Sequence, residues 1–117
     1  MSEIAFNVDN NKQLAFLKKI SEIDKNLYQP GIERKFTKPE HKKKFNNYRG
    51  QWTIYVNTVR NNIGTILINK LEQNEKGFED GIKAINQEIQ EINHTGGFLE
   101  ILGRTIDILD NIVRLVI

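Results

Sequence analysis

Residues 98–117, with the sequence FLEILGRTIDILDNIVRLVI, form the stretch that decides the fold of this protein. Twelve of these twenty residues are apolar. The polar positions recur at spacings of four and three, at Glu100, Arg104, Asp107, Asn111 and Arg114. Such a spacing places the polar side chains along one line of an α-helix. The solvated stripe is therefore narrow, and the wide apolar face must be covered by other helices or by a partner.

A second apolar line precedes this stretch, after a turn expected at residues 74–77. Apolar residues recur there at spacings of four and three on a polar background, at Phe78, Ile82, Ile85, Ile89 and Ile92. This is the two-position heptad pattern of a coiled coil. Residues 94–97 then separate two helices, and so short a connection predicts antiparallel neighbours. If the two glycines are absorbed into a bend, residues 78–117 instead form one long helix that pairs with residues 38–74.

The N-terminal half contains two further helical patterns. Alternation of apolar and polar residues at 3–8 predicts a short extended arm over residues 1–9. A helix follows over residues 10–28 and ends before Pro30-Gly31. Thr37 and Glu40 form a capping box with Pro39 in the first turn, which predicts that a helix starts near residue 38.

Two interpretations compete over residues 51–71. The apolar residues Trp52, Val56, Val59 and Ile63 follow a helical spacing of four and three. The β-branched and aromatic runs 52–59 and 65–68 would instead suit the strands of a hairpin. Because alternation fails at residues 54–56, the helical interpretation is favoured.

These patterns predict an all-α fold with four helices near residues 10–28, 38–73, 78–93 and 97–117. We expect a single domain over residues 1–117, built as a four-helix bundle or as a long helical hairpin with an N-terminal helix. The apolar faces are also expected to form oligomers, because their width suits a coiled-coil partner. The predicted partner interface consists of Ile82, Ile85, Ile89, Ile92, Leu102, Ile106, Leu109 and Val113.

Charge is distributed unevenly along the chain, although the net charge is only +2. Residues 1–71 hold 13 Lys and Arg against 6 Asp and Glu, a net of +7, whereas residues 72–117 hold 4 against 9, a net of −5. Much of the positive charge lies in one segment, at Arg34, Lys35, Lys38, Lys42, Lys43, Lys44 and Arg49. Such a run is more often a solvated helix face, with a phosphate-binding surface as the alternative. The nearby rings of Phe45, Tyr48 and Trp52 have helical spacing and are expected in the core.

The sequence contains no catalytic signature. It has no cysteine, no phosphate-binding glycine loop and no nucleophile elbow. Glu91 and His94 have the spacing of a di-iron ligand pair, but residues 41–71 contain no Asp or Glu to complete such a site. We therefore expect no enzymatic activity, no cofactor, no metal site and no small-molecule substrate.

The sequence thus predicts a non-enzymatic helical protein that binds a protein partner, or itself, through apolar helix faces. The alternative is a nucleic-acid-binding accessory protein that uses residues 34–49. We expect no membrane span, because the longest apolar segment carries five charges. The N-terminus lacks the basic start and apolar core of a signal peptide, so we expect a cytoplasmic location.

Overall fold

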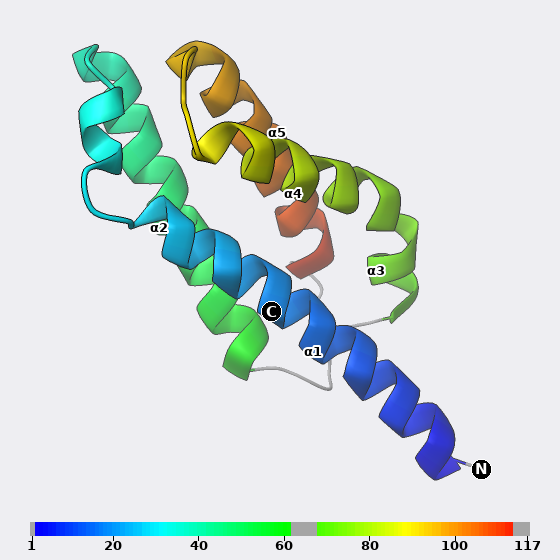
Figure 1. Ribbon diagram of the computed structural model, residues 1–117. Coiled ribbons are helices and arrows are strands. Elements are labelled where there is room, and N and C mark those ends of the chain that lie inside the picture. The colour runs from blue at the N-terminus through cyan, green and yellow to red at the C-terminus, as the bar shows by residue number, and fades with distance from the viewer. Residues whose placement is uncertain (1, 62–67, 114–117) are drawn as a thin grey trace.

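The computed structural model describes residues 2–61 and 68–113, and every regular element among them is helical (Figure 1). The all-α fold predicted from the sequence is confirmed for these residues. In chain order the elements are α1 (Ser2–Leu27), the 3-10 helix η1 (Ile32–Lys35), α2 (Pro39–Asn61), α3 (Ile68–Gln73), α4 (Glu75–Ile89) and α5 (Thr95–Val113).

Helix α1 begins at Ser2, so the extended arm predicted over residues 1–9 is wrong for residues 2–9. No glycine or proline occurs between residues 2 and 29, and nothing in the sequence therefore interrupts the helix before Pro30. Ile4 and Val8 are four residues apart, which is a helical spacing as well as part of an alternation. The chain turns after α1 at Gly31, whose φ of 84° lies in the left-handed region that favours glycine.

Helices α1 and α2 pack side by side and antiparallel. The indole Nε1 of Trp52 donates a hydrogen bond to the carbonyl oxygen of Ile20 at 2.8 Å. One residue further along α2, the hydroxyl of Thr53 donates to the carboxylate of Asp24 at 2.6 Å. Residues 52–59 lie within α2, which confirms the helical interpretation there and shows that the strand interpretation is wrong for them.

The single helix predicted over residues 38–73 is wrong. α2 ends at Asn61, and α3 lies next to α4, away from the last turn of α2 (Figure 1). Part of the predicted helix and most of the second predicted strand, at residues 65–68, fall on residues 62–67. These residues lie outside the described part of the chain. Asn74 alone separates α3 from α4, so the turn predicted at residues 74–77 is shorter than expected.

Helices α4 and α5 are antiparallel neighbours, as the short connection predicted. Gly77 faces Ile108 and Gly81 faces Thr105, so α5 runs in the opposite direction to α4. The break between them falls at residues 90–94, and Gly96 and Gly97 belong to the first turn of α5. One continuous helix over residues 78–117 is therefore wrong.

The approach of α4 to α5 depends on Gly81. A Cβ atom at this position would lie 2.3 Å from Oγ1 of Thr105, which itself donates to the carbonyl of Ile101. We expect Gly81→Ala to lower the free energy of unfolding by about 1–3 kcal/mol, because overpacking outweighs the gain in helix propensity. Urea denaturation measures the change.

Gly50→Ala is the matched control for that variant. Gly50 lies in the interior of α2, and a Cβ atom there would meet nothing within 4 Å. We expect this substitution to raise stability by about 0.5–1 kcal/mol through helix propensity alone. Equal stabilisation by both substitutions would show that α4 and α5 do not approach as closely as described.

The isoleucine seam of α4 and the wide face of α5 lie inside the protein. None of the eight residues of the predicted partner interface is more than 8% exposed: Ile82, Ile85, Ile89, Ile92, Leu102, Ile106, Leu109 and Val113. The chain covers them itself, through contacts of α1 with α2, α2 with α5, α5 with α4 and α4 with α1. The predicted interface is therefore corrected to core, because side chains so deeply buried offer a partner almost no surface.

The described residues form an elongated body with extents of 54 × 23 × 22 Å. α1 runs along much of this length, and its first turns extend beyond the other helices (Figure 1). None of the described helices is both long enough and apolar enough to cross a membrane.

Candidate functional site

Six cationic side chains surround the start of α2, and we call this surface the basic end. It consists of Arg34, Lys35, Lys38, Lys42, Lys43 and Lys44. All six are exposed, and none forms an ion pair with a described residue. The sequence analysis predicted these residues as one candidate site, and the structure brings them together at one end of the molecule (Figure 1).

The basic end is held in place by the apolar residues between its cations. Ile32 of η1 and Phe36 after it are buried, and the ring of Phe36 stacks on that of Phe45 with centroids 4.2 Å apart. η1 is thereby fixed against α2. Because successive residues of an α-helix are about 100° apart, Lys42, Lys43 and Lys44 fan over about 200° of the surface.

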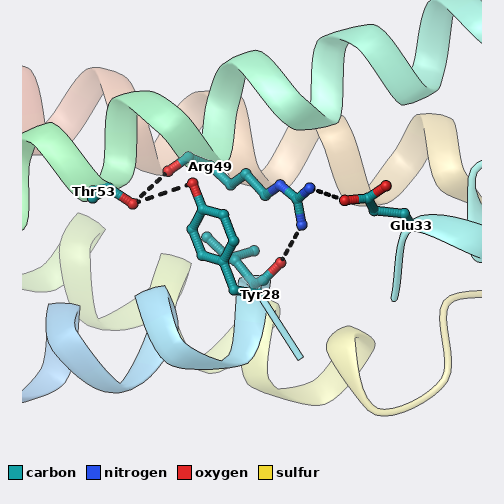
Figure 2. A network of polar contacts seen from close by, with 5 residues as sticks. Tyr28, Glu33, Arg49 and Thr53 are labelled. Carbon is teal, nitrogen blue, oxygen red and sulfur yellow. Dashed lines mark hydrogen bonds and ion pairs between the residues drawn. The ribbon is translucent and has the colours of Figure 1, made fainter. Parts of the chain in front are cut away.

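Arg49, the seventh predicted residue, does not belong to this surface. Its side chain is only 12% exposed and forms an ion pair with Glu33 (Figure 2). It also donates to the carbonyl oxygen of Leu27 at 3.2 Å. Its guanidinium lies over the rings of Tyr28 and Phe45, at 4.5 and 5.0 Å from the centroids. Arg49 therefore ties η1 and the end of α1 to α2, and its prediction as a nucleic-acid contact is corrected to a structural role.

A hydroxyl cluster beside Arg49 strengthens the same junction. Thr53 lies one turn along α2, within 3.1 Å of the carbonyl oxygen of Arg49 and 3.4 Å of the hydroxyl of Tyr28 (Figure 2). Sequence reasoning missed Tyr28 and Glu33 as partners of Arg49. Both are too distant along the chain for helical spacing to indicate the contact.

Most aromatic rings near the basic end are buried, and the exposed ring of Tyr28 is covered on one face by Arg49. Phe36, Phe45 and Trp52 are buried, as the helical spacing of the last two predicted. Tyr48 is half-buried, with the Lys44 ammonium 5.7 Å from its ring centroid. Proteins that bind unpaired bases commonly stack them on exposed rings. The basic end therefore offers much charge and little surface for stacking.

Part of the charge asymmetry is matched inside the chain. Lys12 of α1 pairs with Glu72 of α3 at 3.0 Å, and Lys19 of α1 pairs with Glu79 of α4. Both pairs are exposed, so each contributes little to stability. The cations of the basic end form no ion pair with a described acidic residue, unlike Lys12 and Lys19 of α1.

One of the two histidines joins α2 to α5. Nδ1 of His41 in α2 lies 2.8 Å from the hydroxyl of Thr95, the first residue of α5. Glu91 and His94 fall in the connection between α4 and α5, where the regular helical spacing of a ligand pair is absent. Within residues 2–61 and 68–113, no three His, Asp or Glu side chains are grouped in a way that could hold a metal ion.

Comparison of the chain with protein-family models, with curated proteins and with solved structures gives no match.

Proposed function

We propose that this protein is a non-enzymatic nucleic-acid-binding protein whose basic end contacts the phosphate backbone. The observation that carries the proposal is the group of six exposed cations without an ion-pair partner among the described residues. Unpaired surface cations attract a polyanion by releasing its condensed counterions. A four-helix bundle of α1, α2, α4 and α5 as the scaffold, and a location in the cytoplasm, are parts of the same proposal.

The geometry of the basic end favours binding without sequence preference. Five of its six cations are lysines, which act as point charges and lack the paired donors that read base edges. Arg49, which has such a fork of donors, is occupied by Glu33 and Leu27. Because Phe36, Phe45 and Trp52 are buried and Arg49 covers one face of the exposed Tyr28 ring, the contacts are expected to be mainly with phosphates.

The number of cations limits how strongly binding responds to salt. Lys42, Lys43 and Lys44 point in different directions, so one strand does not meet all six cations at once. With about four phosphates neutralised, the plot of log affinity against log salt on single-stranded DNA should have a slope of roughly −3, at about −0.7 per phosphate.

The experiment is a fluorescence-anisotropy titration of labelled single-stranded DNA and RNA with the variant Lys42→Glu, Lys43→Glu, Lys44→Glu. The three lysines are exposed, so the fold is expected to persist. We expect affinity at low salt to fall at least about a hundredfold, because most of the phosphate contacts are replaced by repulsion.

The matched control replaces Lys18, Lys76 and Lys83 with glutamate; these lysines are also exposed and have no ion-pair partner among the described residues. In both variants three positive charges are lost and three negative charges gained, so the net charge changes from +2 to −4. The control is expected to lose much less affinity than the basic-end variant. Equal losses would show that only net charge matters, and absence of binding by the unmodified protein at low salt would refute the proposal.

The sequence also predicted binding of a protein partner, or of a second copy of the chain, through apolar helix faces. Such binding requires a surface other than the isoleucine seam. The seam is buried by the chain itself, so it supports stability. An apolar surface for a partner would have to lie among the exposed and half-buried side chains outside the core, such as Leu14 and Ile54.

A further inference from the structure

A shallow groove of about 400 Å³ runs along the outer side of the helix pair α4 and α5. Its floor and walls are mainly apolar, with Gly77, Gly81 and Ala84 contributed by α4 and Ile101 and Ile108 by α5. Both isoleucines are half-buried and pack against the core from outside. The groove is separate from the basic end, which lies on η1 and the first turns of α2.

The groove exists because two glycines bring the helices together. A Cβ atom at Gly77 would lie 3.1 Å from Cδ1 of Ile108, and one at Gly81 would lie 2.3 Å from the hydroxyl of Thr105. The backbone of α4 is therefore bare along this line. The isoleucines of α5 rise beside it, and their outer surfaces remain accessible.

Two opposite charges border this groove at nearly the same height along the helices. Asp80 precedes Gly81 on α4 and Arg104 precedes Thr105 on α5, and Gly81 and Thr105 are in contact. Both charged side chains are exposed, and neither forms an ion pair with a described residue. The groove thus combines an apolar centre with one unpaired acid and one unpaired base on opposite helices.

We propose that a second copy of this chain docks in the groove, related to the first by a two-fold axis parallel to the helices. Rotation about such an axis leaves the position of each residue along the helix direction unchanged. It exchanges the two sides of the groove, one of which is formed by α4 and the other by α5. It places α4 of each copy over α5 of the other, so that each Asp80 faces Arg104 of the second copy. The two pairs then form together, as the symmetry of an isologous interface requires.

The charge pattern selects this symmetry over its alternative. A two-fold axis perpendicular to the helices would place α4 over α4 and bring the two Asp80 side chains toward each other, and likewise the two Arg104 side chains. Like charges in apposition disfavour that arrangement. Burial of the isoleucines supplies the affinity, whereas the exposed ion pairs determine orientation and specificity.

The test uses charge reversal and mixing. Asp80→Arg alone places the introduced guanidinium against that of Arg104 in the second copy. Arg104→Asp alone places the introduced carboxylate against that of Asp80, so each single variant repels itself. In a mixed dimer, the guanidinium introduced at position 80 of one variant faces the carboxylate introduced at position 104 of the other. The native Arg104 of the first variant faces the native Asp80 of the second. Both contacts join opposite charges, so the mixture should form a heterodimer. The doubly reversed variant, Asp80→Arg with Arg104→Asp, should again form a homodimer.

Sedimentation equilibrium distinguishes these outcomes for the full chain, with far-UV circular dichroism as the check on folding. The unmodified protein should have twice its monomer mass of 13.6 kDa, or 27.2 kDa. Each single variant should dimerise at least about tenfold more weakly, and the equimolar mixture should regain the dimer. Ala84→Glu, which places a charge in the apolar centre, should also weaken the dimer, and no pairing of charges should restore it.

A monomer at about 1 mM unmodified protein, a concentration at which even weak dimers are populated, would overturn the proposal. Single variants that dimerise like the unmodified protein, or a mixture that stays monomeric, would also overturn it. The variant with glutamate at 42, 43 and 44 should dimerise normally, because none of these three lysines lines the groove. Loss of nucleic-acid binding and loss of dimerisation are therefore separable results.

Discussion

Ile85→Asp is expected to unfold the protein. Ile85 has no exposed surface and lies at the centre of the α4 seam. An unpaired carboxylate at this position would cost several kcal/mol of desolvation, and the lost isoleucine packing adds to it. The total of roughly 5 kcal/mol or more is comparable to the whole stability of an ordinary domain. Far-UV circular dichroism and thermal denaturation measure the effect.

Asn86→Asp is the matched control for that substitution. Asn86 is the next residue of α4 and is exposed, so the same charge is introduced without burial. Its effect is expected to stay within about 0.5 kcal/mol. If the seam were an interface between subunits, Ile85→Asp would instead give a folded monomer. That result would reverse the correction made by the structure and restore the interface predicted from the sequence.

The second large effect is expected at Trp52. Its side chain is fully buried between α1 and α2, and its indole donates to the carbonyl of Ile20. Trp52→Ala should lower the free energy of unfolding by about 3–5 kcal/mol through the cavity that it leaves. Denaturation in urea, followed by circular dichroism, measures this loss without relying on tryptophan fluorescence.

Trp52→Phe separates the contribution of packing from that of the hydrogen bond. It keeps an aromatic ring in the site but removes the Nε1 donor, so it should cost clearly less than the alanine substitution. A loss of less than about 1 kcal/mol for Trp52→Ala would be incompatible with a buried tryptophan that joins two helices.

The helical class and the buried faces could be predicted from periodicity. The four-three spacing identified Ile82, Ile85 and Ile89 as one apolar line, and all three are buried. The same reasoning placed Phe45 and Trp52 in the core. Periodicity shows which face of a helix avoids water, but it carries no information on whether the covering surface belongs to the same chain. That limit explains why the seam was assigned to a partner.

Element boundaries were predicted less well where the local signals were weak. The alternation at residues 3–8 indicated an extended arm, yet α1 begins at Ser2 because no residue there stops a helix. The helical spacing of Leu14, Leu17 and Ile20 predicts that Leu14 lies on the apolar side of α1, but Leu14 is 46% exposed and Phe16 is buried. One residue of rotation turns a helix by about 100°, so a small error in phase moves such a side chain from core to surface.

The candidate site was predicted in part. Six of the seven cations proposed from composition are exposed at one end, but Arg49 is committed to Glu33 and to the rings of Tyr28 and Phe45. These are tertiary contacts, and the spacing of charges does not reveal them. Gly77 and Gly81 are four residues apart, a spacing that can indicate a close contact between helices. The residues of α5 that face them, Ile108 and Thr105, could be identified only from the structure.

The proposed function requires that the basic end contacts nucleic acid. Chemical-shift mapping of the ¹⁵N-labelled protein, titrated with single-stranded DNA at low salt, tests it most directly because it reports both binding and location. We predict perturbed amides in η1 and the first two turns of α2, with little change on the outer side of α4 and α5. Perturbations centred away from residues 32–44, or none at saturating DNA, would contradict the proposed function.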